Sequence, residues 1–136
     1  MVDKKRIIAF AIVILLIVIV VRDRWIQQRP KSYAIGQINT SPYWPTDAGP
    51  EVAFIYYIGK EKYINTTGLP YKMEGRTYKG DCFIVTVPEG YPEKGQLWFK
   101  YKLKSCEGLE DGILWTKPQD VPDSILMKHW FGRYEF

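Results

Sequence analysis

A run of fifteen apolar residues near the amino terminus constrains this chain more than any other feature. It begins at Ile7, ends at Val21 and contains no polar residue. A cleaved signal peptide would need small residues before its cleavage site, and this run ends in "VIVVRDRW" instead. A core helix of this length would show a polar face, which the run lacks. We therefore expect an uncleaved helix over about residues 6–26 that contacts the lipid bilayer through Ile7-Val21.

The length of the run is short for this role. Fifteen residues at about 1.5 Å per residue cover roughly 22 Å, whereas the hydrocarbon core of a bilayer is about 30 Å thick. Arg6 and Arg22 could extend their side chains to the interface, and Trp25 suits that environment. Residues 1–31 are thus predicted to be a membrane anchor with a juxtamembrane linker.

The charge of the chain is concentrated beside this run. Residues 1–31 contain seven Lys and Arg against two Asp, a net +5, and the other 105 residues carry a net −1. A nucleic-acid reader should carry positive charge on its folded domain. This distribution therefore argues against nucleic acid as a partner.

The same residues bear on localisation. Three basic residues precede the run and four follow it closely, which leans slightly towards a cytoplasmic domain. The short head "MVDKKR" instead resembles the start of a secretory signal. We expect a single-pass signal anchor in the plasma (inner) membrane with an extracytoplasmic, periplasmic domain, and the cytoplasmic orientation stays open.

Residues 32–136 show the patterns of a small antiparallel β domain. Short stretches rich in β-branched and aromatic residues occur at 32–38, 52–58, 62–67, 82–87 and 97–103. Gly59-Lys60 suits a two-residue hairpin turn that would pair Tyr56 with Tyr63 and Ile55 with Ile64. The proline-rich stretch 41–50 is expected to be a loop. The predicted fold is mainly β, a barrel or curled sheet of five or six strands, SH3-like or OB-like.

Two strands of this domain carry the only cysteines, Cys82 and Cys106. Strict alternation would put one apolar face of each strand together. The expected partners are Phe83, Val85 and Val87 opposite Leu103, Tyr101 and Phe99, or two residues from that register. Both cysteines then lie on the outer face, opposite or diagonal to each other. That geometry permits a disulfide without requiring one, and two free cysteines are the alternative.

The tail of the chain has weaker signals. "GILWT" could add a sixth strand. Pro122 near a start and Gly132 at a stop, with apolar residues between them on one face, indicate a short C-terminal helix. Such a helix could cover Trp98, which would otherwise point outward.

The stretches "YYIGKEKY" and "YKGDCFIV" resemble motifs of small, uncharacterised bacterial proteins of Bacteroidetes type. Those proteins carry one N-terminal membrane helix, then a tyrosine–hydrophobe–x–Gly–x–x–tyrosine pattern, then Lys-Gly-Asp–x–aromatic–x–Val and a proline-rich turn. The matching positions here are Tyr56 or Tyr57, Gly59, Tyr63, Lys79, Gly80, Asp81, Phe83 and Val85. The resemblance covers roughly residues 33–100 and implies a small β-barrel-like domain after a membrane helix, with no activity attached.

Candidate chemistry is sparse. His129 is the only histidine, and "EGLEDG" lacks the alternating ligand spacing of a calcium loop, so no metal, cofactor or small-molecule substrate is expected. Gly59, Gly80 and Asp81 are expected in turns, where an aspartate bonds nearby amides. Tyr43 and Trp44, held between prolines, and the outward Trp98 are the candidate interaction surface.

These features favour a non-enzymatic interaction module at the cell envelope that holds an unidentified envelope protein. A cytoplasmic OB-like binder of nucleotides or nucleic acid, through Trp98, Lys100 and Lys102, is one alternative. An enzyme that uses carboxylates such as Asp81, Glu89 or Glu93 is the other.

Overall fold

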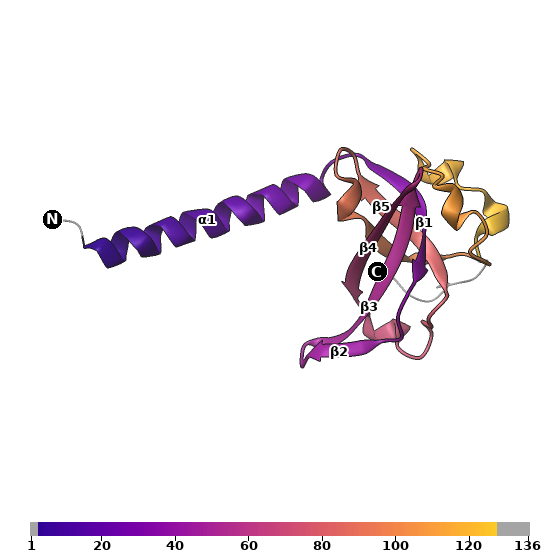
Figure 1. Ribbon diagram of the computed structural model, residues 1–136, viewed down its shortest axis with the longest axis horizontal. Helices are drawn as coiled ribbons and strands as arrows, with labels where there is room; N and C mark the ends of the chain where they lie inside the picture. Colours follow the sequence, from indigo (N-terminus) through magenta and orange to yellow (C-terminus); the bar gives the residue numbers. More distant parts are fainter. Residues whose placement is uncertain (1–2, 128–136) are drawn as a thin grey trace. The chain divides into compact units, whose positions relative to one another are not determined.

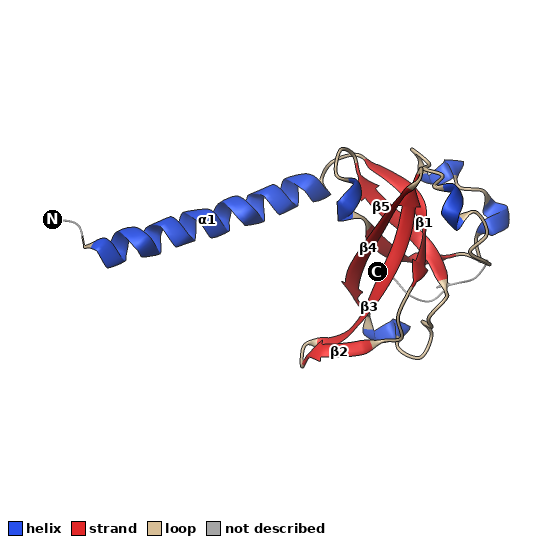
Figure 2. Cartoon of the chain, viewed as in Figure 1, coloured by secondary structure: helices blue, strands red, loops and turns tan. Residues whose placement is uncertain are grey.

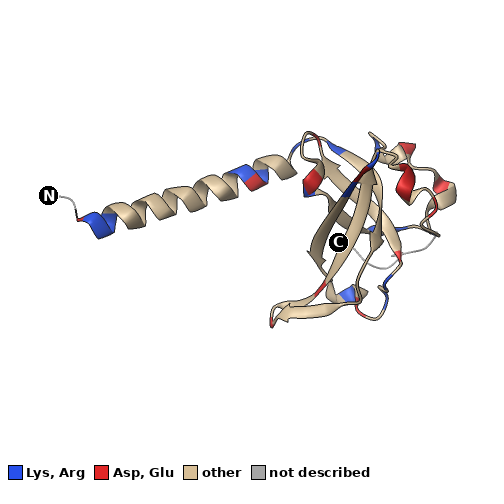
Figure 3. Ribbon diagram, in the orientation of Figure 1, with Lys and Arg blue, Asp and Glu red and all other residues tan. Residues whose placement is uncertain are grey.

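The computed structural model describes residues 3–127, and the chain divides at Pro30 into two units that we treat separately. The first unit consists of helix α1 (Lys4–Gln27). Asp3 caps its start by accepting a hydrogen bond from the backbone N–H of Lys5 at 3.1 Å. The charged residues of α1 lie at its two ends, with the apolar run between them (Figure 3).

The helix forms where the sequence predicts it, but its predicted role is wrong. Among the residues described, no helix has both the length and the apolar character needed to cross a membrane. The apolar run stops at fifteen residues, about 22 Å of helix, and charged residues bound it on both sides. The predictions of a transmembrane anchor in the bilayer and of a single-pass inner-membrane localisation are therefore wrong.

The second unit is built on six antiparallel strands (Figures 1 and 2). The sheet order is β2-β3-β1-β5-β6, with β4 paired to β3. The strands are β1 (Lys31–Ile38), β2 (Tyr43–Thr46), β3 (Gly49–Ile58), β4 (Glu61–Gly68), β5 (Cys82–Pro88) and β6 (Gln96–Lys102). The mainly antiparallel β character agrees with the sequence, but the predicted barrel is wrong because the sheet is not closed.

Side chains of β3 and β4, rather than a strand ladder, connect these strands to the turn before β6. The Asn65 side-chain amide donates to the carbonyl of Gly95 at 3.0 Å. The Tyr56 hydroxyl donates to the carbonyl of Pro92 at 2.6 Å and accepts from the N–H of Gly95 at 2.9 Å. The 3₁₀ turn η2 (Pro92–Lys94) presents its backbone to these side chains, so the edges are connected locally without closing a barrel.

The β3–β4 hairpin follows the predicted register. Tyr56 pairs with Tyr63 and Ile55 with Ile64, and Gly59 has a φ of 60°, which only glycine adopts readily. The stretch 41–50, predicted to be a loop, instead forms β2 and the start of β3. All four residues of β2 are exposed, and β2 is a short strand at the edge of the sheet. Proline lacks a backbone N–H, and an edge strand can accommodate Pro45 because one of its sides forms no hydrogen bonds with a neighbouring strand.

The β5–β6 pair departs from the predicted register. Ile84 faces Trp98, but the preceding residue Phe83 faces Lys102, so β6 contains three extra residues at this point. Side chains alternate along a strand, and an odd insertion therefore moves everything beyond it to the opposite face. Leu97 and Phe99 keep the predicted face, whereas Tyr101 and Leu103 move to the other.

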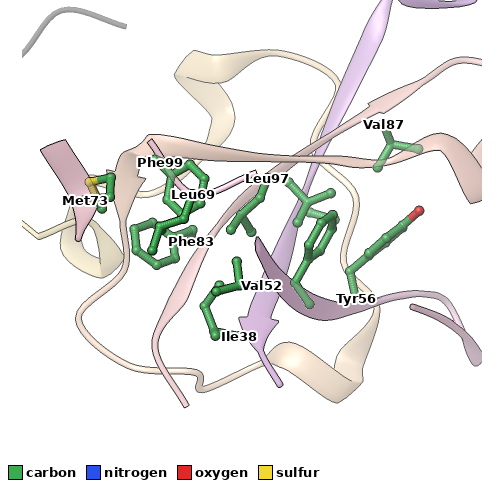
Figure 4. Packing of buried hydrophobic residues seen from close by; sticks show 12 residues of the cluster. Ile38, Val52, Tyr56, Leu69, Met73, Phe83, Val87, Leu97 and Phe99 are labelled. Atoms are coloured by element: carbon green, nitrogen blue, oxygen red, sulfur yellow. The ribbon is translucent and has the colours of Figure 1, made fainter. Parts of the chain in front are cut away.

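Two hydrophobic clusters cover the two faces of the sheet. The inner cluster has Phe83 and Phe99 packed edge to face, with ring centroids 5.3 Å apart. Figure 4 shows Met73, Leu69 and these two rings at one end of the cluster and Tyr56 at the other. Met73 belongs to the 3₁₀ turn η1 (Tyr71–Met73). The complete inner cluster consists of Ala34, Ile38, Val52, Phe54, Tyr56, Leu69, Met73, Phe83, Val85, Val87, Leu97 and Phe99.

The outer cluster is covered by residues 104–127, the C-terminal segment. This segment contains three 3₁₀ turns, η3 (Leu109–Asp111), η4 (Pro118–Asp120) and η5 (Asp123–Ile125), which lie beside the upper part of β1 in Figure 1. "GILWT" forms only a single bridge, between Trp115 and Tyr33. The predicted C-terminal helix is wrong for its described part, because η5 is a single 3₁₀ turn and Leu126 after it is extended and forms a bridge with Leu103. The residues after 127, with His129, lie outside the described residues.

Candidate binding site, an aromatic pocket

A pocket of about 210 Å³ lies between the outer face of the sheet and the C-terminal segment. Its sheet wall has aromatic side chains around Ile84, which is buried. Its other wall consists of residues from η4, η5 and their neighbours. We call this site the aromatic pocket, and the residues that line it are Tyr33, Ile84, Trp98, Tyr101, Pro118, Gln119, Val121, Asp123 and Leu126.

Trp98 is the central ring of the sheet wall. Its centroid lies 5.8 Å from that of Tyr33, with the planes tilted by 30°, and 4.3 Å from that of Tyr101 in an edge-to-face arrangement at 69°. All three side chains are half-buried. Rings in these arrangements attract one another beyond the area they bury, so the wall is a preformed aromatic surface.

The strand register explains how these rings meet. Ile84 pairs with Ile35 on β1 and with Trp98 on β6. Tyr33 is two residues from Ile35 and therefore shares its face. Regular alternation would put Tyr101 on the face opposite Trp98, and the three-residue irregularity of β6 brings both into the outer cluster.

The opposite wall has no strand ladder to position it, and separate contacts hold the C-terminal segment in place. Tyr33 and Trp115 exchange two backbone hydrogen bonds of 2.7 and 2.8 Å. The N–H of Gly59, in the β3–β4 turn, donates to the carbonyl of Gly112 at 3.0 Å. Near the end of the segment, the N–H of Lys104 donates to the carbonyl of Ile125 at 2.9 Å.

A disulfide between Cys82 and Cys106 adds a covalent link to these contacts. Their Cα atoms are 5.5 Å apart, and both residues belong to the outer cluster. Cys82 begins β5, and Cys106 lies three residues before η3. The bond therefore ties the first part of the C-terminal segment to the sheet, close to where the segment leaves β6.

Polar groups are few in the pocket. Among the described residues of the lining, Asp123 is the only charged one, and its side chain is exposed. Within residues 3–127, no hydrogen bond or ion pair reaches its carboxylate. Gln119 is the one side-chain amide of the lining. The site thus combines π faces and apolar surface with a single negative charge.

Of the predicted interaction surface, only Trp98 belongs to the pocket. Tyr43 and Trp44 lie on β2, where Trp44 is 66% exposed, and neither belongs to the two hydrophobic clusters. Trp98 does not point freely outward, because the C-terminal segment packs near it. The structure thus does not unite the three residues on one surface.

The predicted turn residues occupy turns. The Asp81 carboxylate accepts a hydrogen bond from the N–H of Tyr78 at 3.0 Å and pairs with Lys102 at 3.2 Å. Gly80 has a φ of 97°. Asp81 is thereby occupied in holding the loop before β5 against β6. The pairing of Lys102 also removes one cation from the basic aromatic face considered for nucleic acid.

Tyr33, Tyr101 and Asp123 were missed as site residues. Tyr33 is two residues from Ile35 on the same strand, and this spacing could have placed it on the face of the pocket. Tyr101 was expected on the opposite face, and Asp123 lies in an irregular segment without a sequence pattern. Among the described residues, no three His, Cys, Asp or Glu side chains gather in a way that could hold a metal ion. The carboxylates considered for catalysis, Asp81, Glu89 and Glu93, do not line the pocket.

Comparison with known proteins gives no family assignment: no protein-family model, no curated protein and no solved structure matches this chain significantly. The resemblance to Bacteroidetes-type proteins stays a prediction. The fold and the pocket define the chain as a small open antiparallel β domain with an aromatic pocket on its outer face.

Proposed function

We propose that this β domain is a non-enzymatic protein-interaction module that holds a side chain of a partner protein in the aromatic pocket. The observation that carries this proposal is the half-buried wall of Tyr33, Trp98 and Tyr101 beside an open cavity. Tyrosine and tryptophan are the residues most enriched at the energetic centres of protein interfaces, especially where they line pockets.

The size of the pocket supports this function over catalysis. Sites for small molecules and cofactors usually enclose about 300–1,000 Å³, and the pocket has about 210 Å³. That volume suits one large side chain. The part of its lining that the structure describes offers no pair of a nucleophile and a base, and the one carboxylate there is exposed rather than buried.

The proposal is tested by selecting displayed random peptides on the immobilised full chain and then measuring how selected peptides bind. We expect a Trp98→Ala variant, checked by circular dichroism for an intact fold, to bind at least tenfold more weakly. A Trp44→Ala variant is the matched control, because Trp44 is exposed and outside the pocket, and it should bind like the wild type.

Side-chain NMR gives an independent measurement. On addition of a selected peptide, the indole N–H signal of Trp98 should shift and that of Trp44 should not. Selection of no peptide, or binding that depends on Trp44 and is indifferent to Trp98, would contradict the proposal.

A further inference from the structure

We infer that the occupant of the aromatic pocket is an arginine side chain of the partner, an inference that rests on the proposed function. Two features of the lining point to a cation. The first is the set of three rings, whose π faces attract positive charge. The second is the carboxylate of Asp123 at the same pocket, which has no hydrogen bond or ion pair to any other residue of the range 3–127.

The C-terminal segment, which forms the second wall of the pocket, also carries negative charge. Each 3₁₀ turn of the C-terminal segment carries acidic residues: Glu110 and Asp111 in η3, Asp120 in η4 and Asp123 in η5. Figure 3 shows these acidic residues on the turns beside the sheet. An anionic ligand would meet both this charge and the negative faces of the rings, so the pocket selects against it.

One ring of the pocket, that of Tyr101, already has a cation beside it, the ammonium group of Lys100. The Nζ atom of Lys100 lies 5.8 Å from the centroid of the Tyr101 ring, within the range of a cation–π contact. Lys100 is exposed and is not part of the lining, so it leaves the cavity itself available.

Among cations, the arginine side chain fits this combination best. Its planar guanidinium can stack on an aromatic face while its N–H groups donate to a carboxylate. It is also weakly hydrated compared with an ammonium group, and entry into a largely apolar cavity therefore costs less desolvation. The aliphatic part of the side chain can contact Ile84, Val121 and Leu126.

The experiment uses four peptides identical in sequence except at one position, which is arginine, citrulline, lysine or norleucine, titrated into the full chain by calorimetry. Citrulline keeps the shape of arginine without its charge, and norleucine tests the apolar contribution alone. We expect the arginine peptide to bind at least tenfold more tightly than the citrulline and norleucine peptides, and several-fold more tightly than the lysine peptide.

An Asp123→Asn variant should weaken binding of the arginine peptide about fivefold, as expected for a partly screened ion pair, and leave the norleucine peptide unchanged. Asp120→Asn is the matched control, because Asp120 is a neighbouring acid outside the lining whose carboxylate accepts a hydrogen bond from Thr116. It should bind the arginine peptide like the wild type.

The outcomes separate this inference from the proposed function. If citrulline or norleucine peptides bind as tightly as the arginine peptide, the pocket holds an uncharged side chain, and the arginine inference fails while the interaction module stands. Equal loss in the Asp123→Asn and Asp120→Asn variants would also overturn it. If neither these peptides nor any selected peptide binds, both proposals fail.

Discussion

The hydroxyl group of Tyr56 accepts a hydrogen bond from the backbone N–H of Gly95 at 2.9 Å, with the tyrosine side chain fully buried in the inner cluster. The same hydroxyl donates to the carbonyl of Pro92 at 2.6 Å. One buried side chain thus satisfies two backbone groups of the turn between β5 and β6.

Replacing Tyr56 with phenylalanine should therefore lower the free energy of unfolding by about 1–3 kcal/mol, because the buried N–H of Gly95 would be left without this partner and the half-buried carbonyl of Pro92 would lose its hydrogen bond. Chemical denaturation followed by tryptophan fluorescence measures the change. Tyr63→Phe is the control, since the Tyr63 ring stacks on Tyr56 with centroids 5.3 Å apart and its substitution retains that ring. A similar loss in both variants would show that the Tyr56 hydroxyl has no special role.

The stability of the domain should also fall at high pH through this residue. Burial raises the pKa of Tyr56 to about 12, whereas in the unfolded chain it is about 10. Between these values the unfolded state loses the proton and the folded state keeps it, so the free energy of unfolding decreases as pH rises from about 10 to about 12.

Other tyrosines and lysines ionise in this range, and the comparison with Tyr56→Phe isolates the contribution of Tyr56. The stability difference between the wild type and the variant should shrink between pH 10 and pH 12. A difference that stays constant across this range would contradict the prediction.

Gly36 is required for its small size. It lies on β1 between Tyr56 on β3 and Phe83 on β5, and a Cβ atom at this position would overlap the Val85 side chain. Val85 is fully buried and β-branched, so it cannot move aside easily. We expect Gly36→Ala to destabilise the domain by about 1–3 kcal/mol.

The control is Gly68→Ala at the end of β4, where an added Cβ would contact nothing within 4 Å. Thermal unfolding should show Gly68→Ala unchanged or slightly stabilised, by up to about 1 kcal/mol, because alanine restricts the unfolded chain. Equal midpoints for the two variants would contradict the packing described for Gly36.

The disulfide should contribute measurably to stability. It spans 24 residues of sequence, and a loop of that size is expected to contribute about 2–4 kcal/mol. The double variant Cys82→Ala/Cys106→Ala should unfold at a correspondingly lower denaturant concentration. Reductant should bring the wild type to nearly the same midpoint and leave the double variant unchanged. A wild type insensitive to reductant, and as stable as the variant, would contradict this role.

The regular parts of the fold could be predicted from the sequence because local chemistry determines them. A glycine at a turn between two β-branched stretches specifies the β3–β4 hairpin, and its register follows. By contrast, β2 was missed because Pro45 disfavours a strand everywhere except at an exposed edge. Whether a strand is at an edge depends on the whole sheet.

The pocket could not be predicted from sequence patterns because it, too, depends on contacts between distant parts of the chain. Its sheet wall depends on the irregularity in β6, and no residue there signals an extra loop within an otherwise alternating strand. Its second wall is an irregular segment positioned by contacts distant in sequence, such as Gly59 with Gly112. The fifteen-residue apolar run misled in the opposite direction: its composition indicated a membrane span, but the run is too short and is flanked by charged residues, and no described helix has both the length and the apolar character needed.

The three extra residues in β6 reverse the inward and outward alternation of all side chains that follow them in the strand. Side-chain direction has a period of two, so the number of inserted residues matters more than their identity. With three extra residues, Tyr101 joins Trp98 on the outer face. With two or four, Tyr101 would return to the inner face and the pocket would lose a ring. A change of length in this one strand could therefore create or remove a binding site while the sequence on both sides stays the same.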